Sequence, residues 1–268
     1  MTVVVAVVQM KCVTYDKKTN FQIAARLIEE AGEKNSEVIV LPELFNTGYS
    51  CTERDWELAE FTEGETEAFL RKYAEKYNCT IVGGFVEKSE IKGLVYNSLL
   101  IVTPGKKAEV YRKIYLWGPE KNRFIKGKEL VLCETPKAKL APQICYEAGF
   151  PENSRILALS GADILIYSSA FGEARYYVWD LATRARALET GCYVIASNHS
   201  KSEKDVFFCG HSRIIDPQGQ VLCEVLEDNG VAVANIDLEK IYSQRRDLPY
   251  LRDLDVELVK EGYSTIEK

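Results

Sequence analysis

Histidine, paired cysteines and long apolar runs are all scarce in this sequence of 268 residues. With only 2 histidines, the serine–histidine and cysteine–histidine schemes of nucleophilic catalysis have little material to work with. The 8 cysteines are scattered and form no Cys-x-x-Cys pair, which argues against a disulfide framework and a structural zinc site. We expect free thiols, most of them acting as small buried apolar side chains.

No stretch approaches the roughly 18 apolar residues that a membrane-spanning helix needs. The opening MTVVVAVVQM has no basic residues before its apolar run and turns polar at Gln9 and Lys11, which predicts a buried first strand and not a signal peptide. The net charge is -6, and no basic block suggests a nucleic-acid surface. We therefore expect a cytoplasmic protein with neither a membrane nor a nucleic acid as its partner.

Strand-like and helix-like patterns alternate along the chain, which predicts an α/β protein. Helical spacing occurs at Thr19–Gly32, Thr66–Tyr77, Glu152–Ser160 and Tyr176–Thr190. Strand-like runs occur at Val3–Val8, Glu37–Leu41, Thr80–Val86, Ser98–Val102, Ala108–Tyr111, Lys139–Ile144, Ile164–Tyr167, Tyr193–Ala196, Ser212–Ile215, Val221–Val225 and Val231–Ile236. The turn signals TPGKK and DPQGQ predict antiparallel pairs as well, so we expect mixed sheets.

No linker rich in proline, glycine or serine divides the chain, so we expect one domain over residues 1–268. The charged residues from about 238 onward are typical of an extended tail that packs on a neighbouring subunit.

Three stretches could carry chemistry. VIVLPELFNTGYS places Glu43 after an apolar strand, either as a solvated turn residue or as a buried carboxylate whose raised pKa suits proton transfer. EVYRKIYLWGPE places Lys113 among apolar and aromatic residues, where it either reaches back to water or lies near a carboxylate. KLAPQICYEAGFPE places Cys145 where an apolar strand gives way to a polar turn, as a structural thiol or as a nucleophile.

Together, these three residues supply a complete set of catalytic groups without histidine. A free thiol is only a few per cent ionised at pH 7, so it needs a base such as Glu43 to take its proton. A nearby ammonium group such as that of Lys113 favours the thiolate and can stabilise an oxyanion.

In this order and spacing, the stretches LPELFNTGY, YRKIYLWGPE and QICYEAGFPE resemble the carbon–nitrogen hydrolase (nitrilase) superfamily. Further matches are GGFVEK, VYNSLLIV, RARALETGCYVIASN and GHSRIIDPQGQVL, so the likeness runs from residue 3 to about 255. The resemblance implies a four-layer α-β-β-α sandwich with two mixed sheets. It also implies homodimers or larger homo-oligomers, and the helix at Tyr176–Thr190 contributes to a dimer interface in the family.

Carried over residue by residue, the resemblance assigns Glu43 as general base, Lys113 as oxyanion stabiliser and Cys145 as nucleophile. The backbone N–H of Tyr146 would complete the oxyanion hole, and Glu120 matches a second glutamate that orients the lysine or the substrate. No cofactor or metal is implied.

Two positions depart from the common family pattern. Gly149 stands where the family commonly has arginine, which puts an arginine contact near the nucleophile in doubt. Pro142 lies in the strand before the nucleophile and cannot donate to a sheet ladder, so we expect a local bulge there.

The remaining candidates concern the substrate. The resemblance places the loop after Ile164–Tyr167 at the pocket, so we expect contacts from Ala170, Phe171 and Glu173, with Tyr49 and Trp117 as further walls. Arg175 is either a solvated residue at a helix start or the receptor for a substrate carboxylate.

Two other groups of residues favour a structural reading. Helical spacing predicts that Trp179, Leu181, Ala182, Ala185 and Leu188 face the core. Cys209, His211 and His199 make a poor zinc site, because no second ligand pair accompanies them. We expect His211 to form hydrogen bonds within the core.

The predicted activity is hydrolysis of a non-peptide C–N bond in a small amide through a cysteine thioacyl intermediate. The sequence leaves open an ω-amide of a dicarboxylate, a simple aliphatic amide, an N-carbamoyl compound and a nitrile as substrates. An N-acyltransferase with the same intermediate and a catalytically silent binding protein are also open.

Overall fold

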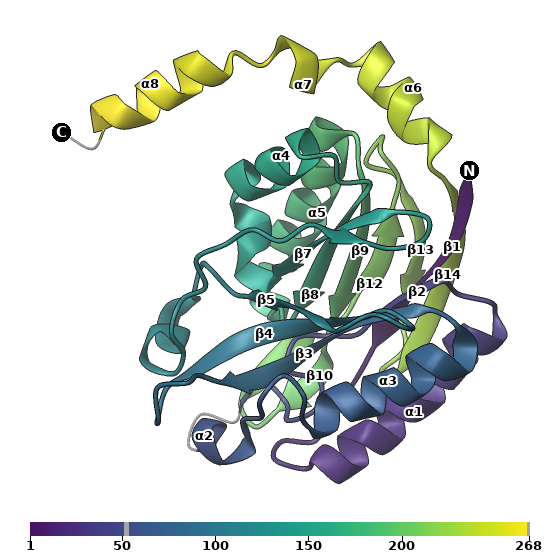
Figure 1. Ribbon diagram of the computed structural model, residues 1–268, viewed down its shortest axis with the longest axis vertical. Coiled ribbons are helices and arrows are strands. Elements are labelled where there is room, and N and C mark those ends of the chain that lie inside the picture. Colours follow the sequence, from purple (N-terminus) through teal and green to yellow (C-terminus); the bar gives the residue numbers. More distant parts are fainter. Residues whose placement is uncertain (51–53, 267–268) are drawn as a thin grey trace.

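The computed structural model describes residues 1–50 and 54–266 and contains two six-stranded sheets packed face to face (Figure 1). Helices α1 (Lys17–Glu33) and α3 (Glu65–Tyr77) cover the outer face of one sheet. Helices α4 (Pro151–Leu159) and α5 (Tyr176–Thr190) cover the outer face of the other. The four-layer α-β-β-α sandwich predicted from the sequence is therefore confirmed.

The first sheet has the strand order β14-β1-β2-β3-β4-β5. β1, β2 and β3 run parallel, and the other neighbours are antiparallel, so the sheet is mixed as expected. The strands are β1 (Thr2–Gln9), β2 (Val38–Val40), β3 (Thr80–Lys88), β4 (Val95–Val102), β5 (Glu109–Arg112) and β14 (Gly230–Asp237).

The second sheet has the order β13-β12-β9-β8-β7-β6, with β7, β8 and β9 parallel and the outer pairs antiparallel. The strands are β6 (Cys133–Glu134), β7 (Lys139–Ile144), β8 (Ile164–Ser169), β9 (Tyr193–Asn198), β12 (Ser212–Ile215) and β13 (Val221–Val225). The predicted hairpins at TPGKK and DPQGQ join β4 to β5 and β12 to β13.

The first strand shows why its sequence is apolar without alternation. Val3, Val5 and Val7 pack in the core between the sheets, while Ala6 and Val8 pack in the core under α1 and α3. Because successive strand side chains point to opposite faces, a strand buried on both faces must be apolar at every position.

The predicted core face of α5 is partly wrong. Trp179 is buried together with Thr183 and Ala187, each four residues further along the helix, whereas Leu181 is 64% exposed. The apolar residues of α5 therefore divide between two faces, and the helix presents some of them to solvent.

The expectation of a bulge at Pro142 is also wrong. β7 keeps an unbroken parallel register with β8 from Leu140 to Ile144. β6 pairs only with Lys139 and Leu140, so one edge of β7 has no strand partner in this sheet at Pro142. A proline that lacks an N–H is tolerated at such an edge.

Three segments differ from the sequence pattern. Strands β10 (Ser200–Glu203) and β11 (Val206–Cys209) form a separate hairpin, whose Lys204-Asp205 turn lacks the usual glycine or asparagine signal. The short helix α2 (Asp55–Leu58) precedes α3. The tail is helical and not extended, with α6 (Glu239–Asp247), α7 (Tyr250–Asp253) and α8 (Val256–Ile266) along the outside (Figure 1).

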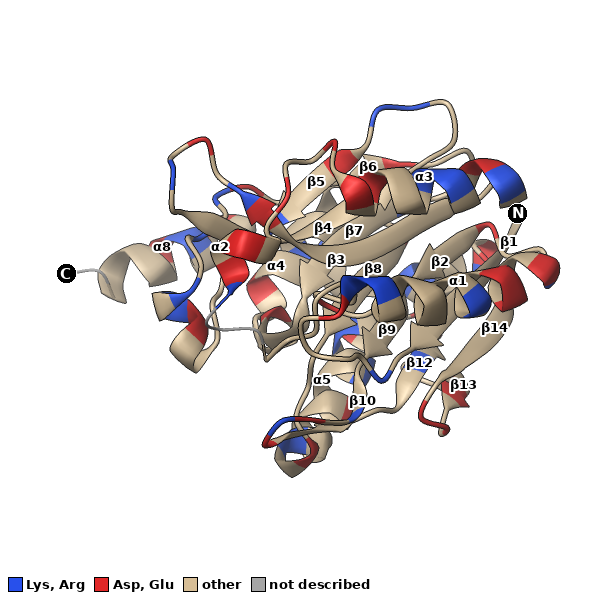
Figure 2. Cartoon of the chain, turned by 90° about the horizontal axis from the view of Figure 1, so that it is seen from below, with Lys and Arg blue, Asp and Glu red and all other residues tan. Residues whose placement is uncertain are grey.

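Acidic and basic residues are interspersed along α1, α3 and the loops (Figure 2). Within the described part of the chain, no helix has the length and apolar character needed to cross a membrane. The described cysteines are free thiols, as expected, and Cys51 lies outside the described residues.

Candidate active site

Cys145 occupies the abrupt turn at which β7 ends. It is the first residue of the 3₁₀ turn Cys145–Gly149, and α4 begins soon afterwards at Pro151. Its φ of 49° lies in the left-handed region, which side-chain-bearing residues adopt only when the surrounding structure enforces it. Such strain at a polar junction is typical of functional residues, and the thiol is only 7% exposed.

Glu43 follows β2 on a turn that depends on a glycine of the neighbouring strand. Leu44 has a φ of 49°, and the turn lies so close to β3 that a Cβ on Gly84 would be 2.3 Å from the backbone nitrogen of Leu44. The second glycine of GGFVEK therefore allows the turn to approach, and Glu43 is completely buried there.

Lys113 follows β5 and joins two buried carboxylates. Its Nζ lies 2.7 Å from Glu43 Oε1 and 2.9 Å from Glu120 Oε1. Asn97 on β4 donates from Nδ2 to the same Oε1 of Glu43 at 2.6 Å, while its backbone oxygen accepts from the N–H of Lys113 at 2.9 Å. The lysine is thus paired with carboxylates and does not reach back to water.

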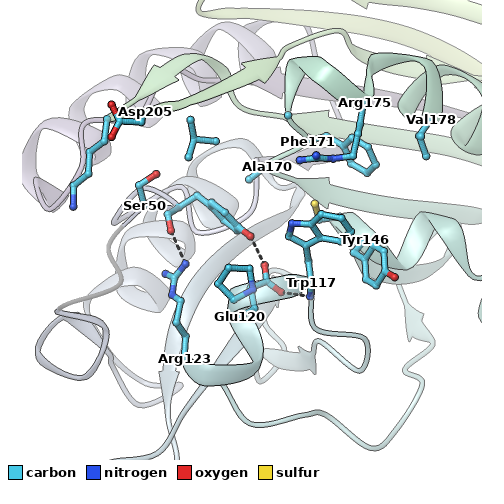
Figure 3. Close-up of a pocket in the computed structure, with 16 residues that line it drawn as sticks. Ser50, Trp117, Glu120, Arg123, Tyr146, Ala170, Phe171, Arg175, Val178 and Asp205 are labelled. Atoms are coloured by element: carbon cyan, nitrogen blue, oxygen red, sulfur yellow. Dashed lines mark hydrogen bonds between the residues drawn. The ribbon is translucent and has the colours of Figure 1, made fainter.

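Glu120 lies in the 3₁₀ turn Gly118–Asn122 and is also nearly fully buried. The hydroxyl of Tyr49 donates to its Oε1 at 2.7 Å, and the backbone N–H of Trp117 donates to its Oε2 at 2.9 Å (Figure 3). Glu120 therefore contacts Lys113 and accepts hydrogen bonds from two residues of the cavity wall.

The electrostatics of these groups follow from burial and proximity. Burial alone would lower the pKa of Lys113, but Glu120 and Glu43 outweigh it and hold that pKa well above its ordinary value, so the lysine is a cation. Burial and Glu43 raise the pKa of the Cys145 thiol, against the lowering effect of Lys113. A protonated thiol needs a base, and the second oxygen of Glu43, Oε2, has no hydrogen-bond partner among the described residues.

These groups adjoin a cavity of about 520 Å³ (Figure 3). Of the residues predicted to form the site, those on its wall are Tyr49, Trp117, Glu120, Cys145, Tyr146, Ala170, Phe171 and Arg175. Glu43 and Lys113 are buried behind this wall. Lys204, Asp205 and Val206 also line this cavity. They lie at and beside the turn of the β10–β11 hairpin, which the sequence did not indicate.

Glu173 is placed differently from the expectation. It is not among the residues that line this cavity and instead lines a second one, together with Cys209 and His211. In the loop after β8, Ala170 and Phe171 thus line the same cavity as the thiol. In the short 3₁₀ turn Glu173–Arg175, Glu173 lines the second cavity and Arg175 lines the first.

The two arginines of the active-site cavity have different environments. The guanidinium of Arg123 is paired with Asp55 at 2.8 Å and hydrogen-bonds to the backbone oxygen of Tyr49. The guanidinium of Arg175 lies 4.9 Å from the ring centre of Trp117, and no ion pair joins it to a carboxylate of the described residues. Of these two arginines on the cavity wall, Arg175 is therefore the one without an acidic partner among the described residues.

Sequence reasoning missed two residues that hold the site together. Asn97 lies in VYNSLLIV, where its apolar neighbours mark a strand and give no sign of its amide's role. Glu147 accepts from the backbone N–H of Ile144 and of Ile114, each at 2.7 Å, and from the hydroxyl of Tyr111 at 2.8 Å. The sequence signal that could have found Glu147 is an acidic residue two positions after the cysteine. Glu147 links the turn of Cys145 to the strand end that carries Lys113.

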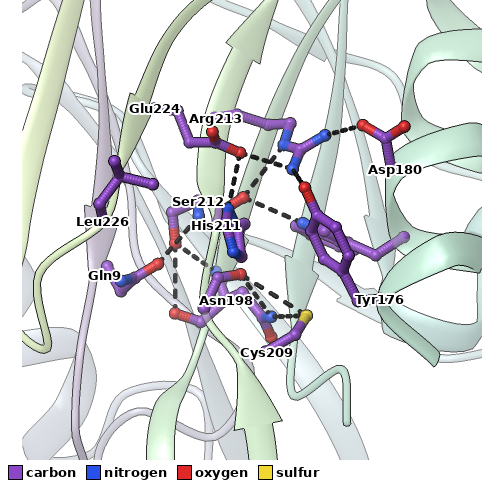
Figure 4. Close-up of polar contacts among 12 residues, drawn as sticks. Gln9, Tyr176, Asp180, Asn198, Cys209, His211, Ser212, Arg213, Glu224 and Leu226 are labelled. Atoms are coloured by element: carbon purple, nitrogen blue, oxygen red, sulfur yellow. Dashed lines mark hydrogen bonds and ion pairs between the residues drawn. The ribbon is translucent and has the colours of Figure 1, made fainter. Parts of the chain in front are cut away.

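The histidines do not combine into the zinc site considered from the sequence. His199 is buried and faces Glu203, whereas His211 is half-buried with its Nδ1 3.1 Å from Glu224 Oε1 (Figure 4). The expectation that His211 belongs to the core is therefore wrong. Among the described residues, Cys12, His199 and Glu203 lie close enough to hold a metal ion, but the 2.8 Å between His199 Nδ1 and Glu203 Oε1 is also the distance of a direct ion pair.

Comparison with known proteins identifies the family of this chain. The sequence profile of the family described as carbon-nitrogen hydrolase matches residues 4–246. A protein named probable nitrilase from Schizosaccharomyces pombe is 36% identical, over 88% of this chain and 89% of its own length. The 2-oxoglutaramate amidase of Bacillus subtilis is 34% identical, over 92% of this chain and 95% of its own length.

A solved structure shows the same fold. The crystal structure of Saccharomyces cerevisiae Nit3, a member of branch 10 of the nitrilase superfamily, matches with a TM-score of 0.86 and 31% identity, over 92% of this chain and 94% of that one. The chain belongs to the carbon–nitrogen hydrolase family of the nitrilase superfamily and is an enzyme of that class.

Proposed function

We propose that this protein is an amidase that hydrolyses the amide group of a small substrate which also carries a carboxylate. The observation that carries the proposal is the buried Lys113, held between Glu43 and Glu120, near a thiol on the wall of a cavity. The carboxylate is proposed because Arg175 lies on the same wall without an acidic partner among the described residues. The name of the Bacillus subtilis relative describes such a substrate, an amide of an oxo-dicarboxylate.

Acylation begins with attack of Cys145 Sγ on the amide carbon while Glu43 takes the thiol proton. The resulting oxyanion is stabilised by the ammonium of Lys113 and the backbone N–H of Tyr146. When the tetrahedral intermediate collapses, Glu43 gives the proton to the leaving nitrogen. The C–N bond breaks, ammonia departs, and the acyl group is left on sulfur as a thioester.

Deacylation repeats these roles with water as the nucleophile. Glu43 takes a proton from the water as it attacks the thioester carbon, and Lys113 again faces the oxyanion. The C–S bond breaks, the sulfur regains a proton from Glu43, and the carboxylic acid leaves. Amide and water thus become acid and ammonia, and every proton is accounted for by residues of this chain.

Ammonia release from a substrate panel tests the proposal. The panel contains ω-amides of dicarboxylates, simple aliphatic amides, N-carbamoyl compounds and nitriles. We expect the ω-amides to have the highest kcat/KM, and the Arg175→Gln variant to lose about tenfold or more of it for them through KM, with little change for uncharged amides. Equal losses for charged and uncharged amides would contradict the carboxylate-binding role.

Intact-mass measurement separates an enzyme from a silent binding protein. Acid quenching of the wild-type protein during turnover of a good substrate is expected to trap a mass adduct on Cys145, because the thioester is an intermediate of the proposed reaction. If no adduct forms and no member of the panel is turned over by the wild-type protein, the binding-protein alternative is favoured instead.

We also propose that the protein forms a homodimer or a larger homo-oligomer through α5 and the tail. Tyr177 and Leu181 on α5 are 66% and 64% exposed, and Leu258 and Ile266 on α8 are similarly open to solvent. Exposed apolar residues on these two helices favour burial against a second copy. Light scattering is expected to give at least twice the chain mass of 30.3 kDa, and Leu181→Glu is expected to lower it.

A further inference from the structure

Side-chain donors from the second sheet reach carbonyl groups at the strand ends of the first. The hydroxyl of Ser168 on β8 donates to the backbone oxygen of Leu41 at 2.7 Å, and the hydroxyl of Ser197 on β9 donates to that of Val8 at 2.6 Å. The third contact is made by His199, just after β9, whose Nε2 lies 2.5 Å from the backbone oxygen of Glu43. Of the three, only this contact involves the proposed general base.

His199 is held in turn by Glu203 on β10. Its Nδ1 lies 2.8 Å from Glu203 Oε1, and both residues are buried. Nδ1 is thus within ion-pairing distance of a carboxylate and Nε2 faces a backbone oxygen, an arrangement that suits a doubly protonated ring. Although burial lowers the pKa of His199, Cys12 and Glu203 outweigh it and hold this pKa well above its ordinary value.

The other oxygen of Glu203 holds the far end of the same turn. Its Oε2 accepts from the backbone N–H of Tyr49 at 2.7 Å and of Ser50 at 3.1 Å. Between these anchors, Leu44 has a left-handed backbone and Gly48 a φ of 81°. A turn with two such residues needs strong contacts to keep one conformation, and charge-assisted hydrogen bonds are of that kind.

We propose that His199 and Glu203, as a buried ion pair, are positioning residues. They hold the turn that carries Glu43 and Tyr49 in a fixed position relative to the sheet that carries Cys145. This inference rests on the proposed function, since it takes Glu43 as the general base. His199 acts on the peptide of Glu43, and Glu203 acts on that of Tyr49, whose hydroxyl contacts Glu120. Neither residue of the pair lines the active-site cavity, and each contacts the turn at backbone atoms, so both act through other residues.

The test compares this pair with the other histidine–carboxylate pair of the chain. Glu203→Gln and His199→Gln remove one partner each while keeping a side chain of similar size. His211→Gln is the matched control, because His211 faces Glu224 outside the active-site cavity (Figure 4). For each variant, kcat and KM are measured per alkylatable Cys145, counted by peptide mapping, so that a loss of folded protein is not read as a loss of rate.

We expect Glu203→Gln and His199→Gln to lower kcat about 10- to 100-fold with KM changed less than about threefold, because small displacements of a catalytic group are costly. Hydrogen exchange in the segment 43–50 is expected to accelerate about tenfold or more in both variants. His211→Gln should change neither quantity. Wild-type kcat per site in both variants, or unchanged exchange in 43–50, would overturn the proposal.

A second measurement needs only folded wild-type protein. With 2 histidines in the chain, a nitrogen-15 histidine spectrum is assigned by comparison with His211→Gln. We expect His199 to be doubly protonated at pH 7.5, and a neutral His199 ring would overturn the proposal even if the other variants do not fold. If the wild type turns over no substrate, the proposed function fails, whereas the spectrum and the exchange data still test the ion pair.

Discussion

The two sheets bring opposite kinds of group to the active site. The first supplies charges, because Glu43 and Lys113 follow its strands, and Lys113 pairs with both Glu43 and Glu120 in a buried cluster. The second supplies a protonated thiol on a left-handed residue, with Ala170 and Phe171 beside it. Lys113 is thus paired within one sheet before any substrate arrives, and the proposed reaction depends on how accurately the two sheets are aligned.

The largest expected effect comes from the second sheet. Cys145→Ala should lower kcat about 10⁴-fold or more, because no other group can form the thioester. The free energy of unfolding, measured in urea, should change little, since the substitution removes one sulfur and relieves no charge. Substantial turnover by this variant would show that another residue is the nucleophile.

A change in the first sheet should cost activity and stability together. Lys113→Met removes the oxyanion partner, for which we expect about a 10²- to 10³-fold loss of kcat. It also leaves Glu43 and Glu120 buried without their cation, which should lower the free energy of unfolding by about 3–5 kcal/mol. Urea unfolding and ammonia release measure the two effects on one preparation.

The matched control for this prediction also removes the negative charge of Glu120, which the lysine substitution leaves unpaired. Lys113→Met combined with Glu120→Gln should regain part of the stability and none of the activity. If the single Lys113→Met variant is as stable as the wild type, the contrast between a charged and an uncharged half of the site is wrong.

The smallest expected effect concerns Glu147, which joins the two halves. Burial raises the pKa of Glu147 from 4.5 to about 7. Between these two pH values, the folded protein therefore keeps a proton on Glu147 that the unfolded chain has lost. The stability contributed by this group is therefore fully present below pH 4.5 and falls by about 3 kcal/mol as the pH rises to about 7.

Glu147→Gln removes that titration, so its unfolding free energy should decline less steeply than that of the wild type between pH 5 and 7.5. The variant is also expected to be less stable overall, because an amide nitrogen cannot accept from the N–H groups that Glu147 holds. Urea unfolding at several pH values gives both quantities, and parallel stability curves would contradict the prediction.

The sequence predicts the parts of this molecule that depend on local pattern. The doubly buried strands, the two hairpin turns and the position of Cys145 at a strand end follow from apolar runs and turn residues. The face of α5 does not, because Leu181 is as apolar as a core residue although it is exposed. The helical tail is missed as well, because its charged composition is equally compatible with an extended segment.

Contacts between distant segments are the other part that the sequence does not predict. Nothing around Asn97 indicates that its amide reaches Glu43, and nothing around Glu203 indicates that its carboxylate holds Tyr49, 154 residues away. These pairings depend on which strand ends the two sheets bring together, and a periodicity read along one segment carries no information about its partners in space.

The hairpin β10–β11 has a consequence for how such an enzyme diversifies. Lys204, Asp205 and Val206 lie at and beside its turn and form part of the cavity wall, yet the proposed catalytic groups follow other strands. Under the proposed function, a mutation in this turn therefore reshapes the cavity while the proposed catalytic groups stay in place. After gene duplication, two copies of this fold could come to accept different acids by changing only a few neighbouring codons.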